Sequence, residues 1–471
     1  MKTPIVISRT RAIDLMMSSW RPRRMSGKWG LSHIPALENV MNRLLMALTV
    51  LIGLLASCDT SLAQPGASAL PWLLITTSVE GNGRGGTGAT LPTTDPAAVM
   101  ANPAQLGIFS LGNTFSASTY SPKVDWLPGF GFPSPVTLNV DALSAGFNFG
   151  DALSLPVSAS VGVGYSRAFL DLGKYTVFSP FSSLAVGAVD ANEKSESYSV
   201  GVGLEYLFKI GLGFNFKKVT SHEPNYVTGG PVAVTSTPSA RDFGVLLQVP
   251  LDSLAAQVAG NRLMIGAALR PALDLSLGYV RSNVGDEVRF DAGQPGDPLP
   301  RSAVVGLGVR AGLATRLGGK EQQLVSFALV RQADDELTIR HPDGTYVFKN
   351  GLGDIRLWDN VILGKTTGYV AVRKGWEVGV ADCLVVRGGS VIGDGFDYAT
   401  TGYTISLGGM LRLLAFADAR FADAPWFTYV GDHIDLQFQS ATYFVSSQSI
   451  SSPLNGTSFQ ALSLVIRGVP W

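Results

Sequence analysis

Three glycines in the first quarter of the chain have the spacing of a dinucleotide-binding loop. Gly81, Gly83 and Gly86 fit G-x-G-x-x-G, in which the backbone approaches a pyrophosphate at a helix N-terminus. Pro92 and Pro96 follow within ten residues, so we expect no helix after the last glycine to hold a phosphate. We therefore predict no nucleotide cofactor and assign these glycines to a compact segment that is neither strand nor helix.

No other residues have the spacing of an enzyme or metal site. His222, His341 and His433 are isolated in sequence, and Cys383 is expected within a strand. The patterns H-E-x-x-H, G-x-S-x-G and paired cysteines do not occur. We therefore expect a protein that is not an enzyme and has no cofactor and no metal, although residues distant in sequence can still meet in space.

Composition indicates a membrane β-barrel. The 471 residues are 46% hydrophobic and only 15% charged, and they include 54 glycines. No run after residue 64 is long and apolar enough for a membrane-spanning helix. A barrel combines an apolar outer face with a polar or small-residue lumen. Because 36 basic residues balance 36 acidic ones, no nucleic acid partner is indicated.

The N-terminal part has the features of an export signal. Arg43 precedes an apolar run at 44–55, and small residues at 61–63 offer a cleavage site. We assign residues 41–63 to a signal peptide. Together with the barrel-like composition, this signal predicts a location in the bacterial outer membrane, in contact with outer-membrane lipid.

Two alternatives concern the same region. Residues 1–40 fit neither a signal nor a fold, and we interpret them as an upstream extension, with translation beginning at Met41. Leu55-Ala56-Ser57-Cys58 resembles a lipobox, in which Cys58 would carry a lipid. The other interpretation is that Cys58 simply ends the apolar run and is removed with the signal.

Residues 110–471 alternate with the period of two that predicts strands. Between Tyr198 and Phe208 the apolar face begins and ends with aromatic residues, as expected at the two lipid–water interfaces. The fold class is therefore all-β, a transmembrane antiparallel β-barrel of about 14 strands. The expected strands are 110–120, 138–149, 156–168, 197–208, 211–219, 241–250, 261–281, 302–314, 322–332, 356–372, 375–388, 400–415, 433–446 and 457–468.

Residues 64–109 precede the first expected strand, and their prolines forbid a continuous ladder. We expect this N-terminal segment to be a plug in the lumen of the barrel. Its motif consists of Gly81, Gly83, Gly86, Asp95, Asn102 and Pro103.

Two loops differ from the rest. The apolar loop 126–135 contains Trp126, Leu127, Phe130 and Phe132, and it is a candidate partner or ligand surface or a cover packed over the barrel mouth. The loop 333–355 is expected to form a small projecting hairpin, whose adjacent acids at 334–336 we expect to be solvated.

The segment around these glycines resembles the N-terminal region of the PorV/PorQ family of outer-membrane proteins, within the FadL-type barrel superfamily. The resemblance rests on Pro71-Trp72-Leu73-Leu74-Ile75, the glycine cluster 81–88, Asp95, Asn102-Pro103-Ala104 and the first strand and loop, 119–130. The family usually has an acid–arginine pair before the glycines. This chain instead has Val79-Glu80, with its arginine at Arg84.

The resemblance implies a fourteen-stranded barrel with its N-terminal segment in the lumen. It also implies a role in type IX secretion, in which the barrel carries secreted proteins with a C-terminal sorting domain to other secretion components for surface attachment. Asp95 and Asn102 would then be structural. The alternative is a FadL-like transporter of hydrophobic small molecules such as long-chain fatty acids, and a scaffold without a transport role is a third interpretation.

Overall fold

The computed structural model describes residues 68–128, 135–178, 185–225, 232–259, 264–265, 269–290, 295–317, 320–367, 369–393, 396–445 and 454–468. The expected signal peptide and Cys58 lie outside these residues. Phe130 and Phe132 of the apolar loop also lie outside them.

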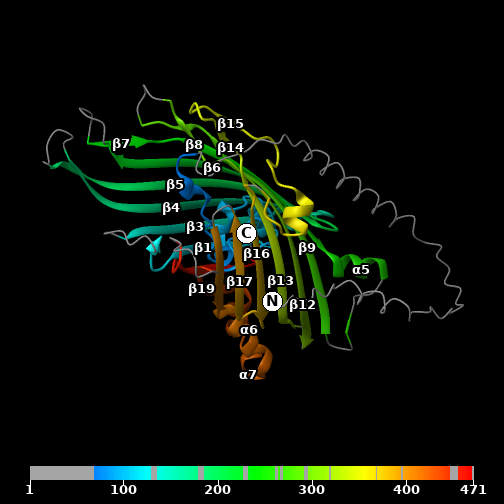
Figure 1. Ribbon diagram of the computed structural model, residues 1–471. Helices are drawn as coiled ribbons and strands as arrows, with labels where there is room; N and C mark the ends of the chain where they lie inside the picture. Colours follow the sequence, from blue (N-terminus) through cyan, green and yellow to red (C-terminus); the bar gives the residue numbers. More distant parts are fainter. Residues whose placement is uncertain are drawn as a thin grey trace, which may run out of the picture. The chain divides into compact units, whose positions relative to one another are not determined.

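The long strands form an antiparallel barrel (Figure 1). The ring closes where β1 (Phe115–Tyr120) pairs with both β3 (Val136–Asn148) and β20 (Ser458–Ile466). The sheet has 16 strands, of which β2 (Val124–Trp126) and β7 (Ala233–Ser236) lie beside the ring, so 14 strands make the wall. The predicted fold class is confirmed.

The other wall strands follow in chain order around the ring. They are β4 (Ser158–Phe178), β5 (Ala185–Glu205), β6 (Lys209–Pro224), β8 (Ser239–Pro250), β9 (Leu269–Gly285), β12 (Ser302–Leu317), β13 (Lys320–Glu336), β16 (Ala371–Val380), β17 (Leu384–Gly393), β18 (Phe396–Ser406) and β19 (Ile434–Val445).

The sequence of β5 shows how the wall acquires two different faces. Tyr198, Val200 and Val202 point outward and are about half exposed, whereas Ser199 and Gly201 point inward and are buried. Successive side chains in a strand point to opposite faces, so this alternation gives an apolar exterior and an interior of small and polar residues.

Four short helices form the N-terminal segment, residues 70–111. They are η1 (Pro71–Leu74), α2 (Val79–Gly83), η2 (Pro96–Met100) and α3 (Gln105–Ser110). Helix α2 contacts β17 to β20, and α3 contacts β3 to β6. The backbone N–H of Ala89, between them, donates to Gln332 of β13 at 3.2 Å. The segment therefore contacts the inner face of the wall on several sides.

Glycine in the wall makes room for this segment. A Cβ on Gly203 of β5 would collide with the backbone carbonyl of Gly107 in α3. The small inward residues of β5 thus set how closely α3 approaches the wall.

Several predicted strand boundaries are wrong. Most of the expected strand 356–372 is loop and a short π-helix, η4 (Leu357–Ile362), and the expected strand 375–388 is divided between β16 and β17. Cys383 consequently lies in the turn between these strands. The expected connection 169–196 is mostly strand, because β4 and β5 are each 21 residues long.

Helices occur where strand or loop was expected near residues 407–433. The expected strand 400–415 ends at Ser406, whose hydroxyl accepts a hydrogen bond from the Gly409 backbone N–H and caps a helix. Three helices follow, α6 (Leu407–Ala417), α7 (Ala419–Ala422) and α8 (Pro425–His433). Two more, α4 (Phe149–Ala152) and α5 (Leu251–Ala259), follow β3 and β8.

The outer loops contain two small hairpins. The predicted hairpin within 333–355 is confirmed as β14 (Thr338–Arg340) paired with β15 (Tyr346–Phe348). A second joins β10 (Glu287–Val288) to β11 (Asp297–Pro298). The expectation of solvated acids is wrong for Asp335, which is 1% exposed and paired with Lys349 at 2.9 Å.

The glycine segment also differs from its prediction, because α2 is a helix that includes Gly81 and Gly83. Ser78 caps it by accepting from the Gly81 backbone N–H at 3.1 Å. Among the described residues, no helix has the length and apolar character needed to cross a membrane.

Candidate functional site

Buried ion pairs join the N-terminal segment to the barrel wall. Glu377 of β16, which is 6% exposed, accepts hydrogen bonds from three arginines. The distances are 2.7 Å from Arg84, 2.9 Å from Arg310 and 3.2 Å from Arg387. Arg84 belongs to the N-terminal segment and the other two to β12 and β17, so one carboxylate links three parts of the structure.

Glu80 extends this cluster on the side of the N-terminal segment. Its carboxylate lies 4.0 Å from Arg84 and 3.4 Å from Arg387. It also accepts a hydrogen bond from the Thr93 hydroxyl at 2.8 Å. The acid and the arginine noted in the sequence therefore lie one turn apart, with Glu80 in α2 and Arg84 directly after its last residue.

Asp95 lies close to this cluster and accepts its hydrogen bonds from neutral groups. Its carboxylate accepts from the Ser78 hydroxyl at 2.6 Å and from the Ala97 backbone N–H at 3.0 Å, which caps η2. Burial, together with the neighbouring Glu80 carboxylate, raises the pKa of Asp95 to about 6. The side chain thus joins the start of α2 to the start of η2.

Asn102 and Pro103 lie where the segment meets β6 and β8. The Asn102 amide donates to the Ala89 carbonyl at 2.7 Å and to the Val245 carbonyl at 3.3 Å. Its Oδ1 accepts from the Ala104 backbone N–H at 3.0 Å. Pro103 packs against the inward glycine of β6, Gly213. These contacts hold a turn of the segment against the wall.

The third glycine of the motif lies in a turn that faces a cavity. Gly86 has φ +73°, a conformation that favours glycine, and its carbonyl accepts from the Thr76 hydroxyl at 3.0 Å. It lies against the guanidinium of Arg373 of β16. The six motif residues therefore belong to one folded segment, but Gly86 alone of them lines the cavity.

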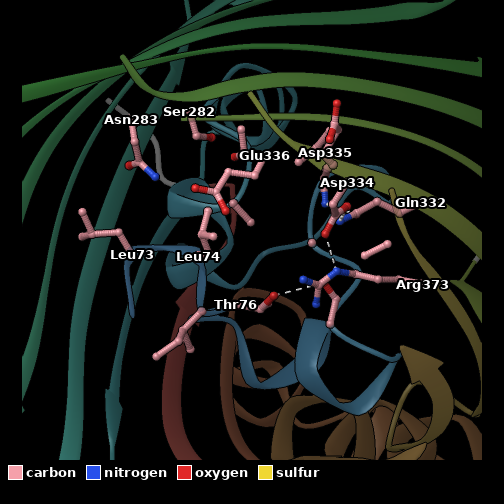
Figure 2. Close-up of a pocket in the computed structure, with 18 of the residues that line it drawn as sticks. Leu73, Leu74, Thr76, Ser282, Asn283, Gln332, Asp334, Asp335, Glu336 and Arg373 are labelled. Carbon is pink, nitrogen blue, oxygen red and sulfur yellow. Dashed lines mark hydrogen bonds and ion pairs between the residues drawn. The ribbon is translucent and has the colours of Figure 1, made fainter. Parts of the chain in front are cut away.

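A cavity of about 230 Å³ separates this segment from the inner faces of β9, β12, β13 and β16 (Figure 2). Its apolar side consists of Leu73, Leu74, Ile75 and Met100. Figure 2 shows Leu73 and Leu74 on one side and Gln332, Asp334 and Arg373 on the other. The cavity therefore has one apolar and one polar side.

Most charged groups on the polar side have a partner of opposite charge, and Glu336 accepts a hydrogen bond from the Ser68 hydroxyl. Arg373 pairs with Asp334, and Lys217 pairs with Asp242 at 2.8 Å. Asp335 is held by Lys349. Since these charged groups already have partners, most of the binding free energy of a ligand would come from covering the apolar side and from hydrogen bonds at the polar side.

Trp126 and Leu127, at the start of the apolar loop, lie outside the lining of this cavity. Trp126 is partly buried and meets the Phe459 ring edge-on, with centroids 6.1 Å apart. Leu127 is partly buried and has φ +60°. Neither residue lines the cavity.

Sequence reasoning missed the wall residues of the cluster, Glu377, Arg310 and Arg387. A signal existed, because Glu377 alternates with the outward Trp376 and so shares the inward face with Gly375 and Gly379. Alternation within the expected strand 375–388 predicts that Glu377 and Trp376 lie on opposite faces, but it does not predict which residues Glu377 contacts. Among the described residues, no group of three or more His, Cys, Asp or Glu side chains is placed to hold a metal ion.

No protein-family model and no curated protein matches this chain. Solved structures similar to it include a Pseudomonas aeruginosa FadL homologue, with 11% identity over 87% of this chain and 100% of that one, at a TM-score of 0.35. The P. putida toluene transporter TodX has 10% identity over 83% of this chain and 99% of its own, at a TM-score of 0.31. The β domain of the Bordetella autotransporter BrkA has 10% identity over 76% of this chain and 98% of its own, also at a TM-score of 0.31. TM-scores this low do not decide function, which depends on the residues of this chain.

Proposed function

We propose that this chain is a bacterial outer-membrane barrel that takes up a small, largely apolar molecule from outside the cell. Support for the membrane location comes from the outward faces of the wall, where Leu, Val and aromatic side chains such as Val200, Phe214 and Leu329 are exposed. A closed barrel leaves no wall strand with unpaired backbone groups in lipid.

The observation that carries the proposed uptake is the two-sided cavity. A cavity of roughly 150 Å³ lined by apolar groups can hold benzene. At about 230 Å³, the cavity beside Leu73 and Leu74 fits a compact apolar molecule with one polar group. A long-chain fatty acid would enter it only in part.

The N-terminal segment acts in this proposal as the plug of the barrel. Its contacts with strands on several sides of the ring leave the cavity on one side of the segment. Passage to the other side requires the segment to shift, and the cluster around Glu377 resists that shift. Binding in the cavity and release of the cluster are thus separate steps.

The test is ligand binding by the barrel reconstituted in lipid nanodiscs, with toluene, octanoate and oleate as probes. Replacing Leu74 with Gln places an amide on the apolar side, and we expect the dissociation constant to rise about tenfold. The matched control is Ile108→Gln, because Ile108 is also partly buried in the segment but does not line the cavity. Equal affinity in Leu74→Gln and the unaltered chain would contradict the proposal.

A second candidate is the carrier role in type IX secretion. It is favoured by the ends of β4 and β5, because strands of 21 residues far exceed the roughly 9–11 that cross a membrane. Near the tip of this hairpin Tyr175, Phe178 and Val186 are exposed. An exposed apolar surface outside the membrane suits a protein partner such as a C-terminal sorting domain, and the apolar loop with Trp126 and Leu127 remains a further candidate surface.

A further inference from the structure

The outer loop between β13 and β16 folds back against the outside of the wall. Its short helix η4 contacts β12 and β13. A groove of about 520 Å³ lies between this loop and the outer faces of β12, β13 and β16. This groove is separate from the cavity inside the barrel, because the two share no lining residue.

The groove has an apolar floor. Val309, Leu329 and Trp376 form part of it, and all three point outward and are exposed. On the loop, Ile362 lines the groove and Trp358, which is 67% exposed, lies in the same helix. The floor is therefore continuous with the apolar outer face of the barrel.

Two cations lie together at the loop end of the groove. Arg331 and Lys374 are cross-strand partners on β13 and β16, and both point outward beside the apolar floor. Gly364 lies over both, because a Cβ there would be 2.8 Å from Arg331 Nε and 3.0 Å from Lys374 Cε. The two positive side chains thus converge on one point.

In the described part of the chain, no acidic side chain balances these cations within the groove. Arg331 donates to the backbone carbonyls of Val361 and Ile362, which fixes η4 but leaves the positive charge unpaired. The Lys374 side chain has no hydrogen bond or ion pair with the described residues. None of the described residues lining the groove is Asp or Glu.

We infer that this groove binds a phosphate-bearing lipid of the outer leaflet. The phosphate would accept hydrogen bonds from Lys374 and Arg331, and the acyl chains would cover the floor at Leu329 and Trp376. Tryptophan beside a cation at the boundary of the apolar surface is typical of the headgroup level of a membrane. The inference rests on the proposed membrane location but not on what the barrel transports.

Native mass spectrometry of the purified full-length barrel tests this inference. Dioctanoyl phosphatidic acid is the probe, and dioctanoyl phosphatidylcholine is the neutral comparison. We expect the unaltered barrel to retain one phosphatidic acid in preference to phosphatidylcholine, and Lys374→Gln to lower the retained fraction about tenfold. Lys218→Gln is the matched control, because Lys218 is an outward lysine of β6 that lies outside the groove.

Folding of each variant is checked by the heat-dependent shift in electrophoretic mobility of the barrel. Equal retention of the two lipids, or equal losses in Lys374→Gln and Lys218→Gln, would overturn the inference. So would displacement of phosphatidic acid by an equal concentration of inorganic phosphate, which would identify a site for the free anion. Because transport is not measured, failure here is distinguishable from failure of the proposed uptake.

Discussion

At the scale of single residues, Glu377 is the centre of the buried ion-pair cluster that joins the N-terminal segment to the wall. Its carboxylate neutralises charge on Arg84, Arg310 and Arg387 at a buried position. Removing one partner of a buried ion pair leaves uncompensated charge, which costs far more than losing an exposed pair.

The variant Glu377→Gln should therefore lower the free energy of unfolding by about 3–5 kcal/mol. Its control is Glu205→Gln, because Glu205 pairs with Lys209 at 3.4 Å where both side chains are about one-third exposed. The control substitution should lower the free energy of unfolding by less than about 1 kcal/mol. Urea titration of the barrel in detergent micelles measures both. Equal losses of stability would show that the buried cluster stabilises the fold no more than an exposed ion pair does.

The cluster could be predicted only in part from the sequence. Glu80 and Arg84 are four residues apart, so a helix places them together. Their wall partner Glu377 lies 293 residues after Arg84 in the sequence. That contact depends on strand register and on how the ring closes, neither of which a local pattern determines.

At the scale of elements, alternation predicted strands well where each has one lipid-facing side. The segment 198–205 is such a case, since its outward Tyr, Val and Leu side chains alternate with buried Ser and Gly, whereas residues 206–208 of the expected strand lie beyond the end of β5. The segment 356–372 failed because Trp358 and Ile362 are apolar in a loop that lies on the outer wall. Short apolar runs do not distinguish a strand from a short helix.

Close packing of α3 against β5 gives a test at this scale. In Gly203→Ala the new Cβ meets the backbone of α3, so we expect the N-terminal segment to detach and become sensitive to protease. The control is Gly164→Ala, also inward-facing, in the adjacent strand β4. There the nearest atom to the new Cβ is the Ser144 hydroxyl at 3.3 Å, so the segment should stay protected.

Proteolysis of the folded barrel, followed by mass spectrometry of fragments from residues 70–111, reads out this difference. If Gly203→Ala and Gly164→Ala were equally resistant, contact between α3 and β5 would not hold the segment in place.

At the scale of the whole molecule, three sites are separate in space. The cavity with Leu74 lies inside the barrel, the groove with Lys374 lies on its outer wall, and the extended hairpin of β4 and β5 carries the exposed Phe178. Composition and alternation predicted the barrel, but each of these sites joins residues from different strands. Uptake, lipid binding and partner binding can therefore be altered one at a time.

The most direct test of the proposed uptake compares a strain lacking this gene with its parent in two assays. One is the uptake of labelled toluene and octanoate, and the other is the protein content of the medium and cell surface by mass spectrometry. We predict that uptake falls, that a copy of the gene restores it, that a Leu74→Gln copy does not, and that secreted proteins are unchanged. Loss of proteins that share a C-terminal sorting domain, with uptake unchanged, would contradict the proposal and assign the barrel to secretion.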